Sequence, residues 1–104
     1  MVEVNNWKDP ELSEAILIWT GYGDSTSPRR DTLTLKRRFN SDAEKWIEII
    51  ELLIDEFYET DANMKAEDLQ DMWTRAIADF RRKHPEAPDE VTKAFAWCYT
   101  FDNR

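Results

Sequence analysis

The residue types best suited to nucleophilic or metal chemistry occur once each in this chain. His84 is the only histidine and Cys98 the only cysteine among 104 residues. A zinc site needs several His or Cys ligands, and a di-metal bundle needs Glu-x-x-His on two helices, so we predict no metal site and no cofactor. His84 precedes Pro85 at a predicted helix end and is expected to interact with the last carbonyls there. A lone cysteine favours a reducing compartment, and Cys98 is expected to be a buried, unreactive thiol.

The triplet Gly23-Asp24-Ser25 follows an apolar run near the N-terminus, and it resembles the nucleophile block of the GDS-type hydrolases. In that family a histidine acts as base, with an aspartate three residues before it. Here that position is Arg81, and the segment before Gly23 is predicted to be helical. The glycines also match neither a P-loop nor a dinucleotide fingerprint. We therefore predict an ordinary turn in which Asp24 and Ser25 bond local backbone amides, and no enzymatic activity.

A basic segment follows this turn. Five bases and one acid lie within ten residues, namely Arg29, Arg30, Asp31, Lys36, Arg37 and Arg38. Three interpretations stay open: the segment neutralises acids elsewhere in the fold, it is simply solvated, or it binds an anion. Anion binding is an option because arginine clusters suit phosphate and carboxylate groups. The candidate anion-binding residues are Arg29, Arg30 and Arg37, with Asp24, Ser25, Asp31, Asp102 and Arg104 as neighbours.

Negative charge is concentrated in the middle of the chain. Residues 41–79 carry 12 acidic and three basic side chains, whereas the other 65 residues carry ten and eleven. The formal net charge of −8 therefore belongs to this middle segment. Such acidity disfavours nucleic acid as a partner, because binding to phosphate backbones needs clustered positive charge.

Part of this charge forms a row on one predicted helix. At about 100° per residue, five acids fall within a sector of about 80°: Glu44, Glu48, Glu51, Asp55 and Glu59. Like charges at i, i+4 destabilise a helix by about 0.2–0.5 kcal/mol per pair, an effect that a basic partner would offset. The predicted partner-binding residues are Glu48, Glu51, Asp55, Glu59 and Asp61, with Glu67 and Asp68 as an extension.

The first helix is predicted over residues 10–20. Asp9 is a natural N-cap, Pro10 suits the first helical position, and Gly21 suits the position after the last turn. Residues 21–31 are predicted to form the one long loop. Residues 32–39 are ambiguous between a strand and a helical turn that pairs Leu35 with Phe39, and a short helix or extended arm is favoured.

Three further helices are predicted, over residues 42–60, over residues 66–83 and from Pro88 to about Tyr99. Ser41 and Glu44 have the spacing of a capping box for the first of these. Residues 60–65 are expected to be a polar turn. Each main helix carries one tryptophan, and these are expected to be core anchors, Trp46 and Trp73 above all.

These elements predict an all-α fold: residues 1–104 form a single helical domain, a compact bundle of four main helices with one longer loop or arm at about 21–40. We expect no signal peptide, because the N-terminal residues show no basic region followed by an apolar stretch. The longest apolar run, Ala15–Trp19, is too short to span a membrane, so we expect a cytoplasmic protein.

Together these features favour a non-enzymatic interaction protein that binds a basic protein partner. In class, it is similar to bacterial immunity and antitoxin proteins, which are often small, acidic and cytosolic. The alternative is a binding site for a small anion or phosphorylated ligand, with or without catalysis, on the segment 21–39. A homodimer is also open, because the helix 42–60 has more apolar surface than a small monomer easily covers.

Overall fold

The computed structural model describes residues 7–103, and every regular element within that range is helical. Helix α1 (Pro10–Thr20) confirms its prediction at both ends. The Asp9 carboxylate accepts a hydrogen bond from the amide of Glu11 at 2.9 Å, and Pro10 occupies the first turn. Gly21 ends the helix with φ of 79°, a left-handed conformation that glycine adopts without strain.

The ambiguous segment after the loop forms a helix, α2 (Thr32–Phe39). Its first turn is capped by Asp31, whose carboxylate accepts from the amide of Thr34 at 2.9 Å and from its hydroxyl at 2.7 Å. Leu35 and Phe39 lie one turn apart and are both buried. The i, i+4 pairing therefore decides against a strand, which would have no partner in this fold.

A 3₁₀ turn, Asn40–Asp42, joins α2 directly to α3 (Ala43–Phe57). The predicted capping box at Ser41 and Glu44 is therefore wrong. Ser41 lies inside the 3₁₀ turn, and the N-cap is Asp42, whose side chain makes no capping hydrogen bond. The chain reaches α3 already coiled, whereas a capping serine needs an extended backbone.

The predicted polar turn at residues 60–65 and the start of the next helix also need correction. Residues Ala62–Lys65 form a short helix, α4, and α5 (Leu69–Lys83) begins three residues later than expected. Asp68 sets this start, because its carboxylate accepts from the amide of Asp71 at 2.7 Å. The last helix, α6 (Asp89–Asp102), runs three residues beyond its predicted end.

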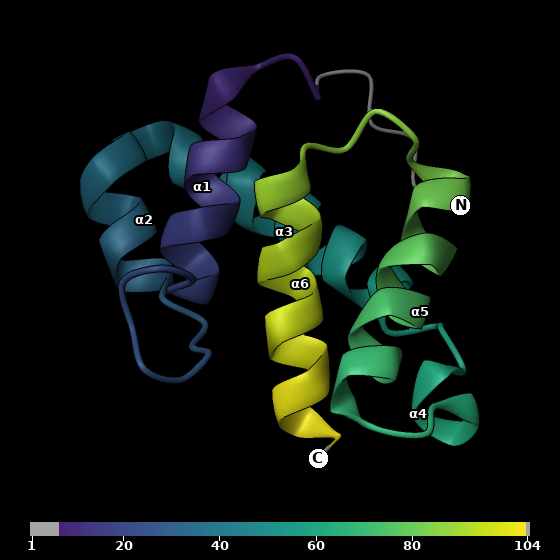
Figure 1. The fold of residues 1–104 in the computed structure, drawn as a ribbon. Helices are drawn as coiled ribbons and strands as arrows, with labels where there is room; N and C mark the ends of the chain where they lie inside the picture. Colours follow the sequence, from purple (N-terminus) through teal and green to yellow (C-terminus); the bar gives the residue numbers. More distant parts are fainter. Residues whose placement is uncertain (1–6, 104) are drawn as a thin grey trace.

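The four longest helices, α1, α3, α5 and α6, make an all-α bundle. Helix α6 packs between α1 and α5, while α3 crosses behind them and contacts α1, α2 and α5 (Figure 1). Phe57 of α3 is central to the core, with ring centroids of Phe80, Phe95 and Tyr99 at 5.2, 5.8 and 6.1 Å. This aromatic cluster ties three helices together.

The tryptophans divide between core and margin. Trp19 and Trp46 are fully buried, as expected, and Trp7 is buried against His84 and Phe80. Trp73 and Trp97 are only partly buried. For Trp73 this departs from the expected core position, because α5 lies at the edge of the bundle.

Candidate functional site

The outer side of α3 carries four exposed carboxylates, Glu44, Glu48, Glu51 and Asp55, which we call the acidic face. Within residues 7–103, none of the four has a basic side chain at ion-pair distance. Leu52 lies beside them and is 51% exposed. The acidic face therefore combines uncompensated charge with an exposed apolar side chain.

The amphipathic pattern of α3 produces this arrangement. Trp46, Ile50, Leu53 and Phe57 recur at helical spacing and are buried in the core. The side opposite that stripe must face solvent, and the acidic face occupies it. The one lysine among these acids, Lys45, lies over the Trp46 ring at 4.4 Å from its centroid rather than against a carboxylate. Nothing on α3 itself therefore neutralises the acidic face.

A surface hollow of about 410 Å³ lies beside the acidic face, between α2 and α3. Glu44, Glu48 and Glu51 line it, together with Ile47 and Lys36. Helix α2 thus brings one base to the margin of the acidic face, but Lys36 forms no ion pair within the described residues. The basic segment of residues 29–38 consequently does not neutralise these acids.

The other predicted partner-binding residues have different surroundings. Glu59 pairs with Lys83 of α5 at 3.0 Å, and Asp61 pairs with Lys65 at 2.9 Å. Hydrogen bonding to Lys65 holds the pKa of Asp61 below its ordinary value. Both acids border a groove of about 420 Å³ between α3, α4 and α5, apart from the hollow beside α2. The five predicted residues therefore fall into an unpaired group of three and a paired group of two.

The predicted extension lies at the start of α5. The Asp68 carboxylate caps that helix, and Glu67 is exposed at the turn before it. Neither residue lines the hollow beside the acidic face. Their part in a partner surface stays a prediction.

Sequence inspection missed one acid on α3 that the structure buries. The Glu56 carboxylate contacts Nε2 of His84, and both side chains are buried. His84 does end α5, and its backbone amide bonds the carbonyl of Phe80, but its ring binds Glu56 rather than the last carbonyls. Helical periodicity could have indicated that Glu56 differs from the other acids. At about 100° per residue, Glu56 falls beside Ile49 and about a quarter turn from the row of acids.

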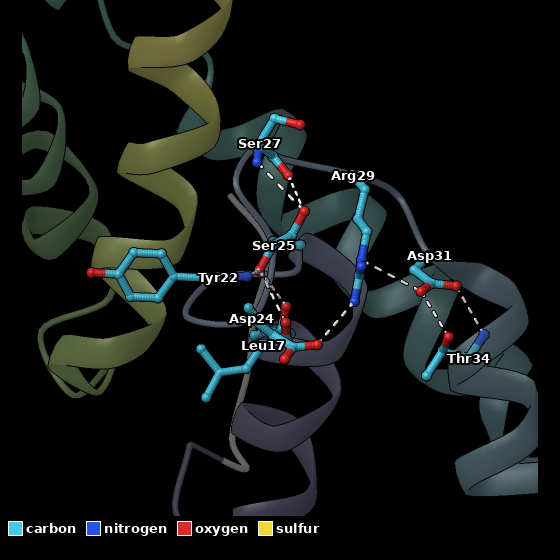
Figure 2. A network of polar contacts seen from close by, with 10 residues as sticks. Leu17, Tyr22, Asp24, Ser25, Ser27, Arg29, Asp31 and Thr34 are labelled. Atoms are coloured by element: carbon cyan, nitrogen blue, oxygen red, sulfur yellow. Dashed lines mark hydrogen bonds and ion pairs between the residues drawn. The ribbon is translucent and has the colours of Figure 1, made fainter.

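The candidate anion-binding arginines do not converge on one point. Arg29 lies between Asp24 and Asp31, with nitrogen–oxygen distances of 3.5 and 3.4 Å, and so helps to close the loop (Figure 2). Arg30 lies over the Trp19 ring at 5.4 Å from its centroid. Arg29 and Arg30 border one small hollow with Asp102, and Arg37 is absent from its lining. The proposed neighbour Arg104 lies outside the described residues.

The remaining nucleophiles have structural surroundings. The Ser25 hydroxyl donates to the carbonyl of Ser27 at 2.8 Å and accepts from its amide, as predicted for a turn (Figure 2). The same prediction is wrong for Asp24, whose carboxylate pairs with Arg29 instead of bonding a backbone amide. Cys98 is buried, as predicted, and burial together with the Asp102 charge raises its pKa to about 12. Over residues 7–103, the acidic, histidine and cysteine side chains form no cluster of three or more that could hold a metal ion.

None of the helices in the described part of the chain is long and apolar enough to cross a membrane. Leu69, Trp97 and Phe101 border a small apolar hollow of about 110 Å³ between α5 and α6. The homodimer stays a prediction.

Comparisons of the chain with protein-family models, with curated proteins and with solved structures found no significant match.

Proposed function

We propose that this chain is a non-enzymatic interaction protein whose acidic face on α3 binds a basic protein partner. The observation that carries the proposal is the absence of intramolecular ion pairs at Glu48, Glu51 and Asp55 within residues 7–103. Similar carboxylates on α5 are paired, so an acidic composition alone does not account for the difference. As part of the proposal, the protein acts in the cytoplasm, in the manner of an immunity or antitoxin protein by class.

The aligned charges favour such a partner in two ways. Repulsion between acids one turn apart is relieved when opposite charges arrive, so binding offsets an unfavourable feature of the free protein. A surface of one sign also steers an oppositely charged molecule and raises its association rate, by an amount that falls with salt.

The hollow beside the acidic face suggests what the partner presents. Ile47 offers an apolar wall for the aliphatic part of a lysine or arginine, and Glu44, Glu48 and Glu51 offer carboxylates for its charged end. Leu52 adds apolar surface that becomes buried on binding. A partner with one inserted basic side chain among further surface bases fits this arrangement.

The proposal can be tested by capture from a lysate of the native organism with the chain immobilised, at low and at high salt. The double variant Glu51→Lys and Asp55→Lys reverses charge on the acidic face. A matched control, Glu86→Lys and Glu90→Lys, makes the same change in net charge at exposed sites elsewhere. A basic protein should be retained by the native chain and the control, released at high salt, and lost with the acidic-face variant.

The affinity of each variant for the captured protein then shows how much the acidic face contributes to binding. We expect the acidic-face variant to weaken binding at least about tenfold, or about 1.4 kcal/mol, mainly through a slower association rate. Equal binding by the acidic-face variant and the native chain would overturn the proposal.

A further inference from the structure

The outward side of α2 combines exposed positive charge with an exposed apolar side chain. Leu33 and Arg37 lie one helical turn apart and are both exposed, and the exposed Lys36 lies beside them. Neither Lys36 nor Arg37 forms an ion pair within residues 7–103, whereas Arg38 is held by Glu14 at 2.7 Å. We call Leu33, Lys36 and Arg37 the basic face.

The acidic face on α3 is built in the same way with the opposite charge. Leu52 is 51% exposed there, as Leu33 is 58% exposed on α2. Glu48 and Asp55 lie one turn before and one turn after Leu52, and neither forms an ion pair within the described chain. Each face therefore offers apolar surface that can be buried and charge that an opposite surface can neutralise.

The two faces are neighbours on one surface of the chain. Lys36 of α2 and Glu48 of α3 both line the hollow of about 410 Å³ between these helices, but they form no ion pair across it. The faces therefore leave each other's charges unpaired within a single chain. A second copy, related by a two-fold rotation, brings the basic face of each chain onto the acidic face of the other.

The spacing of the side chains fits such an arrangement. Leu33 and Arg37 are four residues apart, and so are Glu48 and Leu52. Four residues of an α-helix span about 6 Å. When α2 of one copy lies beside α3 of the other in the opposite direction, Leu33 can contact Leu52 while Arg37 meets Glu48.

We infer that a second copy of this chain covers the acidic face when no other partner does. Leu33 of each copy packs against Leu52 of the other, Arg37 pairs with Glu48, and the two-fold symmetry repeats both contacts. The net charge of −8 on each copy opposes association at long range, so we expect a weak dimer rather than a permanent one. A basic partner would compete with the second copy, and only this competition rests on the proposed function.

Sedimentation velocity of the purified chain over a wide concentration range tests the inference without any other protein. Salt at about 0.15 M screens charges that lie more than about 8 Å apart, while charges in contact still interact. Arg37→Glu and Glu48→Arg each place like charges together in the dimer, and the double variant restores opposite charges at the native net charge. Lys93→Glu and Glu86→Arg are the matched controls, because they make the same single changes at exposed sites elsewhere.

We expect the native chain to reach twice the monomer mass as its concentration rises. Each single reversal should weaken the dimer at least about tenfold, and the double variant should recover most of the native affinity. Both controls should dimerise as the native chain does. Leu33→Gln changes no charge and should also weaken the dimer. Circular dichroism of every variant shows whether a loss of dimer reflects a loss of folding.

A native chain that stays monomeric at every concentration would overturn the inference and leave the proposed function in place. A dimer that survives both single reversals would also overturn it, as would a double variant as weak as either single one. A mass that keeps growing beyond that of a dimer would overturn the two-fold arrangement.

Discussion

Helices α3 and α5 both carry acids on their outer sides, but the two helices differ in whether those acids form ion pairs within the chain. On α5, Asp71 pairs with Arg75 at 2.8 Å and Asp79 pairs with Arg82. On α3, Glu51 has two acids and two isoleucines one turn away, and Lys45, three residues before Glu48, lies over the Trp46 ring instead of forming an ion pair. An acidic stretch of sequence therefore does not always give a surface of unpaired acids. Ion pairing along a helix depends on which residue lies three or four positions away.

The two sides of α3 should differ most in how substitutions on them change the free energy of unfolding. Leu52 and Leu53 are adjacent, but Leu52 is half exposed and Leu53 is fully buried. Leu53→Ala should lower the free energy of unfolding by about 2–5 kcal/mol, whereas Leu52→Ala should change it by less than about 0.5 kcal/mol. Urea unfolding followed by circular dichroism measures both. Similar losses for the two variants would mean that Leu52 has a structural role and would weaken its assignment to an interaction surface.

A second pair of variants compares a buried acid with an exposed one on the same helix. Glu56→Ala removes the partner of the buried His84 ring, so we expect a loss of about 1–3 kcal/mol in the free energy of unfolding. Glu51→Ala is the matched control and should stay within about 0.5 kcal/mol of the native chain. Urea unfolding at pH 7 gives both values, and an equal response would contradict the division of α3 into two chemically distinct sides.

The cap of α2 gives a smaller effect that depends on pH. Hydrogen bonds from Thr34, first from its hydroxyl and then from its amide, hold the pKa of Asp31 below its ordinary value of 3.8. This carboxylate therefore stabilises the fold at neutral pH, and its contribution disappears as pH falls from about 4 through the lower, folded-state pKa. Asp31→Ala should lower the free energy of unfolding by about 1 kcal/mol at pH 7.

The difference between Asp31→Ala and the native chain should shrink in urea unfolding curves recorded at pH 5, 3.5 and 2.5. Asp24→Ala, at the other carboxylate beside Arg29, is the control and should change stability by less than about 0.5 kcal/mol at pH 7. A difference at Asp31 that stays constant down to pH 2.5 would show that its ionised carboxylate does not contribute to the cap.

The smallest effect should differ in sign between α3 and α5. Glu51→Gln removes repulsion with Asp55 one turn away and should raise stability by about 0.2–0.5 kcal/mol at low ionic strength. Asp71→Asn removes the pair with Arg75 and should lower stability. Thermal unfolding at low and high salt measures both, and both effects should diminish as salt screens the charges. Two shifts of the same sign would contradict the distinction between unpaired and paired surfaces.

Much of the fold could be predicted because local signals agreed with tertiary packing. Asp9, Pro10 and Gly21 set the ends of α1, and a regular apolar stripe identified α3. The errors lie where neighbouring elements are joined. Ser41 failed as a cap because the chain arrives from α2 already coiled, and α5 begins late because Asp68 caps it after α4. Such junctions depend on adjoining segments that propensity alone does not describe.

The helical class, the apolar stripe of α3 and the row of acids opposite that stripe follow from helical periodicity, so the order of amino acids is enough to predict them. Which acids of α3 find a partner depends instead on how the helices pack. Packing between helices pairs Glu59 with Lys83 and places the buried Glu56 against the His84 ring, whereas Glu48, Glu51 and Asp55 stay in solvent without ion pairs in the described chain. The reason is that a contact between helices requires two side chains to meet in space, and sequence separations of 24 and 28 residues carry no such information.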